Sequence, residues 1–253
     1  MNNKSIENYL KMKIGIDEPF KFHCTQCGEC CFNRDKEVIL LSANDIFRIA
    51  KSLKLTPGET VKRYGFVYIG ADSRLPIVIL KTIDPMGQCV LLKENKCAVH
   101  DNKPVICAMF PIGRMLKINP EESEDTKQYK IEYLYVNPEC GDDADTHTVS
   151  EWLYQFGISL EDKFFAAWSL ALSKLSLVLQ KAEEHFTEKT MQELWDTTLG
   201  LLYLNYDISQ DFDSQFGANV EKLMELVQIL SQYWDNAGQG DKSTSMSDNK
   251  GNN

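Results

Sequence analysis

Four cysteines within eight residues constrain this chain more than any other feature of its sequence. They are Cys24, Cys27, Cys30 and Cys31, in the pattern C-x-x-C-x-x-C-C. Two residues between cysteines let successive sulfur atoms turn towards one point, and Gly28 frees the backbone for the tight loop that this requires. Because soft thiolate ligands select zinc, iron–sulfur clusters or copper(I) over magnesium and calcium, the pattern indicates metal coordination.

The adjacent Cys30 and Cys31 leave two arrangements open. On an extended backbone, neighbouring side chains point in opposite directions, so one thiol could join Cys24 and Cys27 while the other faces a different site. If the chain turns at this point, both thiols could coordinate one cluster.

A second, dispersed group of cysteines consists of Cys89, Cys97, Cys107 and Cys140. Pro104 is expected to open a short helix at its first position, and Pro111 to close it. The eight cysteines would furnish two four-thiolate sites, or one multinuclear cluster with spare thiols. His100 follows Cys97 by three residues and could replace a thiolate on zinc. A capping or hydrogen-bonding role is favoured for it, because eight cysteines already suffice.

Disulfide bonds and isolated buried thiols account for the cysteines less well than metal coordination does. A disulfide framework would suit their even number, but no secretory signal is recognised, and the 43% hydrophobic content supports a sizeable core. Buried structural thiols suit a single cysteine such as Cys89, but not a cluster. We therefore expect coordination of a metal ion or cluster in a reducing, cytoplasmic compartment.

The charge distribution argues against a nucleic-acid partner. The formal net charge is −10, and residues 146–253 hold 7 basic against 16 acidic residues. Phosphate binding draws on clustered lysine and arginine, which this half lacks. No membrane partner is expected either, because the longest apolar stretch, residues 164–172, is too short to span a bilayer.

The pattern of residues predicts an α+β fold, in which a small, loop-rich cysteine domain with short strands precedes an α-helical region. Capping residues at Ser42 and Thr56 predict helices over 44–53 and from Pro57 to Gly65. Short branched runs predict strands over 38–41, 75–81, 114–118 and 130–136. After residue 150, apolar residues recur at three- and four-residue steps and predict three helices.

These changes of pattern also predict the domain organisation. We expect an N-terminal segment (1–20), a cysteine-cluster domain (21–145), a helical region (146–235) and a disordered tail (236–253). The acidic stretches at 121–125 and 142–145 are expected to be solvated surface, since they lack the regular ligand spacing of a calcium site.

The motifs C-x-x-C-x-x-C-C, G-x-C, C-x-x-H and K-P-x-x-C-x-x-F-P together resemble the CxxCxxCC cysteine-cluster family of YkgJ-type proteins. Its members are described as zinc- or iron-chelating, and often as iron–sulfur proteins. The resemblance covers approximately residues 22–140. In the family an arginine usually precedes the proline, and here Lys103 replaces it, without the planar fork of donors. The resemblance implies as metal ligands Cys24, Cys27, Cys30, Cys31, Cys89, Cys97, Cys107 and Cys140.

Three functions are compatible with this pattern. The first is an iron–sulfur or iron protein of the bacterial cytoplasm, serving redox chemistry or methyl transfer; a distantly similar branch includes flagellin lysine N-methylase. The second is a structural zinc module that presents the acidic helical half to a protein partner. The third is metal storage or sensing. The first is favoured, because adjacent cysteines and proline-bounded ligand turns are common around iron–sulfur clusters.

The sequence does not decide whether the protein is an enzyme. No catalytic triad, paired carboxylate site or phosphate loop is recognised, and neither is a G-x-G-x-x-G or C-x-x-x-C-x-x-C motif. Catalytic residues, substrate and reaction therefore stay unassigned.

Overall fold

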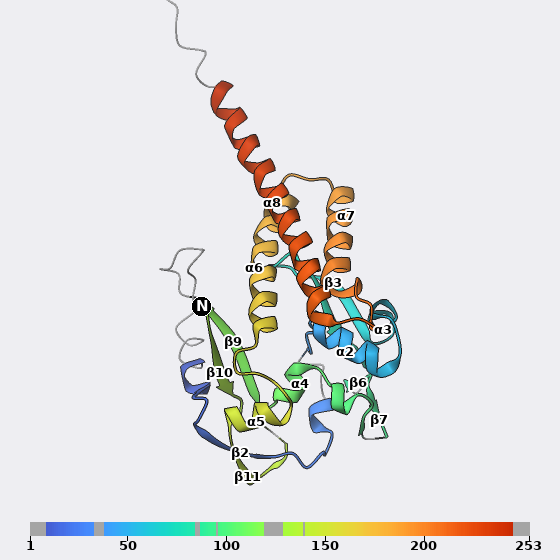
Figure 1. Cartoon of the computed structure of the whole chain (residues 1–253), viewed down its shortest axis with the longest axis vertical. Coiled ribbons are helices and arrows are strands. Elements are labelled where there is room, and N and C mark those ends of the chain that lie inside the picture. The colour runs from blue at the N-terminus through green and yellow to red at the C-terminus, as the bar shows by residue number, and fades with distance from the viewer. Residues whose placement is uncertain are drawn as a thin grey trace, which may run out of the picture. The chain divides into compact units, whose positions relative to one another are not determined.

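The computed structural model describes residues 9–32, 38–83, 87–94, 96–118, 129–138 and 140–244. It confirms the predicted α+β fold, with most strands in the N-terminal half and the long helices in the C-terminal half (Figure 1). The chain divides into two compact units, Met1–Val67 with Val78–Ser169, and Tyr68–Ile77 with Leu170–Asn253. The domain boundaries at residues 145 and 235 stay predictions.

The strands form one three-stranded sheet and several two-stranded sheets. The larger sheet contains β1 (Lys13–Ile14), β10 (Tyr129–Tyr135) and β9 (Ile112–Ile118), in that order. The pairs are β2 (Pro19–His23) with β11 (Asp142–Thr148), β3 (Gly65–Ile69) with β4 (Pro76–Leu80), β5 (Thr82–Ile83) with β6 (Gln88–Cys89), and β7 (Leu92–Lys93) with β8 (Lys96–Cys97).

Most of the predicted strands are present. The strands β4, β9 and β10 confirm those expected over 75–81, 114–118 and 130–136. The run 38–41 lies along β4 without forming a continuous strand, because only Leu40 makes a bridge, to Ile79.

The helices of the first unit begin at the residues that cap them. Ser42 with Asp45, and Thr56 with Glu59, form capping boxes at the starts of α2 (Ala43–Leu53) and α3 (Pro57–Tyr64). Gly65 ends α3 as predicted. The helix α4 (Val105–Met109) has Pro104 as its N-cap, one residue before the position predicted for it.

Apolar stripes position the helices that follow. These are α5 (Val149–Gln155), α6 (Lys163–Glu183), α7 (Glu188–Leu199) with the π-helical turn η3 (Gly200–Leu204), and α8 (Phe212–Thr244). Leu179, Met191 and Leu223, which belong to the predicted stripes, are buried. In the described part of the chain, no helix combines the length and the apolar character needed to cross a membrane.

The end of α8 differs from the expectation of disorder from residue 236 onwards, since the helix continues to Thr244. Extending an existing helix requires no new nucleation, so a polar composition does not by itself stop it. The remainder of the predicted tail, residues 245–253, lies outside the described residues.

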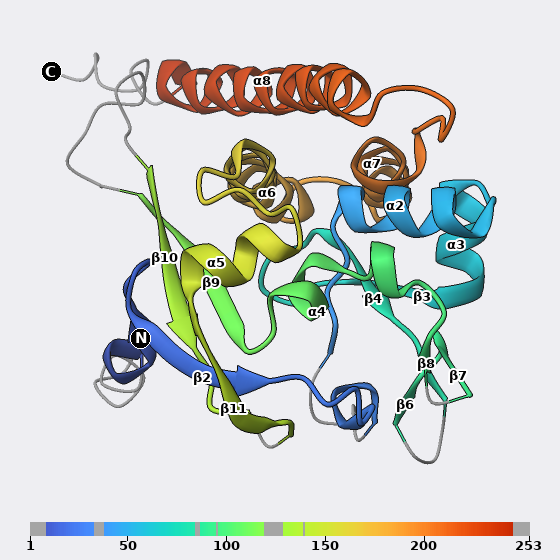
Figure 2. The ribbon, with the colours of Figure 1, turned by 60° about the horizontal axis from the view of Figure 1, so that its bottom comes forward.

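A hydrophobic core lies beneath the cysteine-bearing segments. Figure 2 shows α5 beside β9 and β10, and Trp152 of α5 packs its ring edge-on against Phe22 of β2, with ring centres 5.6 Å apart. The Trp152 Nε1–H also donates a 2.9 Å hydrogen bond to the carbonyl of Met109 in α4. The core therefore supports both the strand that precedes Cys24 and the helix that contains Cys107.

Candidate metal centre

The C-x-x-C-x-x-C-C segment is a tight loop that leaves the end of β2. Gln26 and Gly28 have positive φ angles of 54° and 80°, and the Cys31 N–H donates a 2.7 Å hydrogen bond to the Gly28 carbonyl. This bond closes a short 3₁₀ turn, η1 (Glu29–Cys31). The tight loop predicted at Gly28 is confirmed, and glycine suits its left-handed conformation.

The backbone turns at Cys30 and Cys31 and is not extended there. Neighbouring residues of a 3₁₀ turn point about 120° apart, because three residues complete one turn. The two thiols are nevertheless close enough to be hydrogen-bonded to each other.

Cys140 reaches this loop through the pairing of β11 with β2. In this antiparallel pair, Asp142 lies opposite His23, and Asp142 Oδ1 is 3.0 Å from His23 Nδ1. Gly141 lies against the same strand end, since a Cβ there would be 2.5 Å from the His23 carbonyl oxygen. The Cys140 thiol is consequently hydrogen-bonded to Cys27, although the two residues are distant in sequence.

The thiols of this region influence each other's protonation. Burial, followed by the proximity of Cys30, Cys27 and Cys24, raises the pKa of Cys140 to about 11. The hydrogen bond to Cys30 and then burial raise the pKa of Cys31, with further contributions from Cys30 itself and from two more distant thiols. Both groups are therefore protonated at neutral pH in the metal-free protein, whereas a bound cation would favour their thiolate forms.

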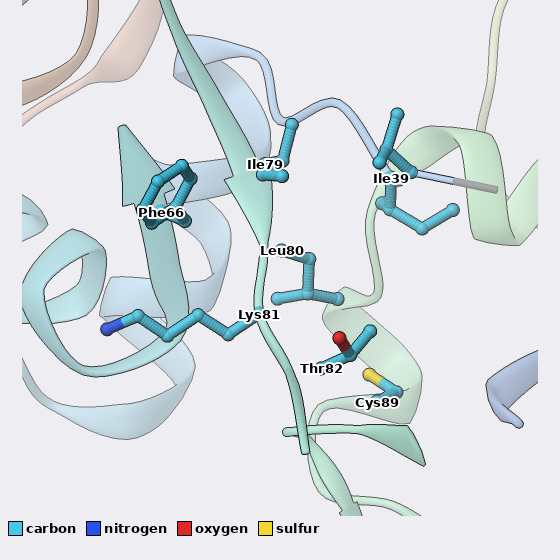
Figure 3. Close-up of a pocket in the computed structure, with 8 residues that line it drawn as sticks. Ile39, Phe66, Ile79, Leu80, Lys81, Thr82 and Cys89 are labelled. Carbon is cyan, nitrogen blue, oxygen red and sulfur yellow. The ribbon is translucent and has the colours of Figure 1, made fainter. Parts of the chain in front are cut away.

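Those more distant thiols are Cys89 and Cys107, from separate elements of the same unit. Cys89 is the buried end of β6, opposite Thr82 of β5. Figure 3 shows the Cys89 sulfur near Thr82. It also shows Lys81 pointing away from that sulfur, and the Lys81 ammonium donates instead to the Lys62 carbonyl, at 2.7 Å.

The structure brings six of the predicted ligands around one cavity of ≈ 610 Å³ in the first unit: Cys24, Cys30, Cys31, Cys89, Cys97 and Cys107. Apolar side chains such as Leu91 and Ile106 form much of the remaining wall. Its other described lining residues include Lys96, Lys103 and His100 but no carboxylate. This excess of basic groups suits a site of negatively charged thiolates.

The two histidines near the cysteines pair with carboxylates. His100 lines the cavity, and its Nδ1 is 3.5 Å from Asp101 Oδ1, while His23 pairs with Asp142. Residues 142–145 are exposed, as predicted, but they begin the unpredicted strand β11. The acidic stretch 121–125 lies outside the described residues.

The chemistry of the donor set fits a thiophilic metal, but the thiols are not arranged as a ligand sphere. Within the described ranges, no group of three His, Cys, Asp or Glu side chains has the spacing needed to hold a metal ion. Soft thiols from several elements nevertheless lie near one another in a partly buried, positively lined site, which suits zinc or iron. Metal binding would require them to approach one another more closely.

Some residues that shape this region could not be assigned a role from the cysteine pattern. The α5 helix was not predicted, although Thr148 and Glu151 carry the capping-box pattern that begins it. The contact of Trp152 with Met109 has no local sequence signal, since it joins residues 43 apart.

Comparisons with known proteins agree with this picture. No curated protein and no solved structure matches the chain. Residues 23–140 match a family model, CxxCxxCC, described as "Putative zinc- or iron-chelating domain". This range includes all eight cysteines. Residues 23–140 are therefore similar to the CxxCxxCC domain family, and this match covers slightly less than half of the chain.

Proposed function

We propose that residues 21–145 hold iron, as an iron–sulfur cluster or as iron ions. The protein would then serve redox chemistry or methyl transfer in the cytoplasm. The observation that carries this proposal is that three cysteines of the C-x-x-C-x-x-C-C loop line one cavity together with Cys89, Cys97 and Cys107. The proposed ligands are Cys24, Cys27, Cys30, Cys31, Cys89, Cys97, Cys107 and Cys140.

The size of the cavity supports a cluster over a single ion. Zinc bound by four thiolates has Zn–S distances of about 2.3 Å and needs little space. The cavity among the cysteines measures ≈ 610 Å³, which leaves room for a group of several atoms. An iron–sulfur cluster would supply one-electron transfer at a potential set by its ligands and surroundings.

A structural zinc module is the alternative, and the small sheets favour it. The pairs β5–β6 and β7–β8 have only two residues in each strand. Such short pairs are marginal by themselves, so bound zinc could stabilise them as part of the folding free energy. In this case the acidic C-terminal half would be free to bind a protein partner.

Metal analysis of protein prepared without oxygen tests both functions. Brown protein that contains iron and acid-labile sulfide, with broad absorption near ~400 nm from thiolate–iron charge transfer, supports the first. Colourless protein with stoichiometric zinc supports the second. Protein that takes up neither metal and folds equally well without them contradicts both.

The variant Cys27→Ser tests whether the loop takes part. We expect it to lose metal and to melt at a lower temperature, because metal-binding free energy contributes to folding. Ser173→Ala, in α6 and away from all cysteines in sequence, is the control and should retain its metal. Unchanged metal content and melting in Cys27→Ser would contradict a ligand role for this residue.

A further inference from the structure

We propose that the cavity beside the cysteines binds a small amphipathic anion, with a carboxylate or phosphate head and an aliphatic body. The inference rests on the proposed function, because this ligand would share the cavity with the metal centre and occupy the part that the cysteines leave open. It adds to that function the class of small molecule that the same site takes.

The cavity is larger and more apolar than a metal centre requires. Its volume of ≈ 610 Å³ lies within the range of small-molecule sites, which is about 300–1,000 Å³. Aliphatic side chains from five segments of the first unit line it together with the cysteines: Ile39, Leu80, Leu92, Ile106 and Ile112. Thiolate coordination does not depend on such a wall, whereas the apolar body of an organic ligand is held by one.

Three aliphatic residues of this lining are exposed to solvent. Val38 is 57% exposed, Ile106 48% and Val136 43%, and they come from segments that are distant in sequence. A single exposed aliphatic side chain is ordinary on a protein surface. Three of them around one concave site indicate apolar surface that a bound molecule covers.

A second hollow, of ≈ 220 Å³, adjoins the cavity and extends its apolar surface. The two have Val38, Ile39, Leu80 and Cys89 in common, and Figure 3 shows the last three of these around the smaller hollow. Phe66 is a further lining residue and is 55% exposed. The body of the ligand therefore has room to extend beyond the cavity, which suits a linear chain.

The charged residues of the lining favour an anionic head. Lys96, His100 and Lys103 line the cavity, and its described lining includes no Asp or Glu. Among the described residues, neither lysine forms an ion pair with a carboxylate. The Lys103 ammonium lies 4.7 Å from the centre of the Phe156 ring, a contact that leaves N–H donors available. A carboxylate or phosphate would accept charge-assisted hydrogen bonds from them.

The experiment titrates the full, zinc-loaded chain with octanoate and with octyl phosphate, by calorimetry at concentrations too low for micelles. 1-Octanol and octylammonium carry the same chain without the negative charge, and acetate carries the charge without the chain. We expect an anion with the chain to bind at least about tenfold more tightly than these three compounds, because head and body both contribute to affinity. The tighter of the two anions identifies the head.

Variants of Lys103 test the contact with the head. Lys103→Gln should weaken binding of the anion at least about tenfold, since a charge-assisted hydrogen bond is lost. Its weak binding of 1-octanol should not change, and Lys103→Arg should retain the affinity for the anion. A variant that merely failed to fold would lose both compounds. Unchanged affinity of Lys103→Gln for the anion would overturn the assignment of the head.

Val38→Asp tests the contact with the body, and Leu40→Asp is its matched control. Both side chains are exposed in the same run, but Val38 lines both hollows and Leu40 is not among the described lining residues of either. We expect Val38→Asp to weaken octanoate binding at least about tenfold, because a carboxylate enters the apolar wall. Leu40→Asp should bind as the wild type does. Equal losses in the two variants would overturn the placement of the body.

Metal content is measured separately, so that this inference and the proposed function fail separately. A chain that takes up neither zinc nor iron contradicts the metal centre, and octanoate binding by that metal-free chain would still support the anion site. If metal binds but neither anion does, or if octanoate binds no better than 1-octanol, the metal centre stands and the inference is overturned. In the zinc-loaded chain, we expect the bound anion to slow the removal of zinc by a chelator. An unchanged rate would contradict a shared cavity.

Discussion

The backbone N–H of Val105 donates a 2.7 Å hydrogen bond to Oδ1 of Asp45. The other carboxylate oxygen of Asp45 accepts bonds from the N–H and the hydroxyl of Ser42, at the start of α2. Only 4% of Asp45 is exposed. One carboxylate thus fixes both the first turn of α2 and the first residue of α4, the helix that contains Cys107.

Replacing Asp45 should be costly for this reason. We expect Asp45→Ala to lower the free energy of unfolding of the metal-free chain by about 2–4 kcal/mol, because a helix cap is lost and the Val105 N–H is left without its partner. Urea denaturation measures this change. Zinc affinity should fall too, since the start of α4 is released.

Glu59 provides a matched control for Asp45. Its carboxylate accepts the same capping bonds, from the N–H and hydroxyl of Thr56, but among the described residues it accepts no hydrogen bond from another element. We expect Glu59→Ala to destabilise the chain clearly less than Asp45→Ala. Equal losses would mean that the Val105 bond contributes nothing.

Gly141 should resist substitution because of where it lies. Its φ is 76°, and a Cβ would meet both the His23 carbonyl oxygen and the Phe22 ring, the latter at 2.8 Å. We expect Gly141→Ala to lower the unfolding free energy by about 2–3 kcal/mol through backbone strain and forced separation of β11 from β2. Metal content should fall as well, since Cys140 moves with this strand.

The control for this change is Gly157→Ala. Gly157 also has a positive φ, of 64°, but a Cβ there would meet nothing within 4 Å. It therefore carries the backbone strain without the clash, and we expect a smaller loss of stability with unchanged metal content. Similar melting temperatures and metal contents for the two variants would contradict the packing argument.

Local signals account for the parts of the fold that the sequence predicts well. The capping boxes at Ser42 and Thr56 depend on side chains within three residues of each other, so they can be read directly from the chain. The left-handed turn at Gly28 follows in the same way from the cysteine spacing.

Long-range pairing accounts for what the sequence could not predict. The strand β11 begins with acidic residues that lack apolar alternation, and its pairing with β2 joins residues more than a hundred positions apart. This pairing decides that Cys140 lies beside Cys27. The number and spacing of the eight cysteines therefore do not decide whether they form one metal site or two.

Trp152 links α5 to the cysteine-bearing helix α4 through its hydrogen bond to the Met109 carbonyl. We expect Trp152→Phe to lower the unfolding free energy by about 1–3 kcal/mol, because this buried carbonyl loses its donor and the smaller ring leaves a void. Zinc affinity, measured by competition with a chelator, should fall with it.

Trp195→Phe separates these two effects. The Trp195 indole makes a comparable 2.9 Å bond to the Arg74 carbonyl, but within the second unit. We expect this variant to lose stability and to keep the wild-type zinc affinity. An equal fall of affinity in both variants would show that general destabilisation, and not the support of α4, governs metal binding.

The ion pair between β1 and β10 predicts how stability depends on pH. Glu132 is buried, and hydrogen bonds from Lys13, at 2.8 Å, and from Tyr9 lower its pKa. A lowered pKa means that the folded state favours the ionised carboxylate. Its stabilisation is therefore complete above the pKa of the unfolded chain, about 4.3 for glutamate, and is lost as the pH falls through the lower folded value.

We accordingly expect the unfolding free energy of the metal-free chain to decrease more steeply in the wild type than in Glu132→Gln as the pH falls from about 5 to 3. At pH 7 the glutamine variant should be the less stable of the two, since it cannot pair with the Lys13 ammonium. Urea denaturation at a series of pH values measures both effects. In a Lys13→Met background, the difference in unfolding free energy between glutamate and glutamine at position 132 should be smaller. Parallel pH profiles for the wild type and Glu132→Gln would contradict a stabilising role for the ionised carboxylate.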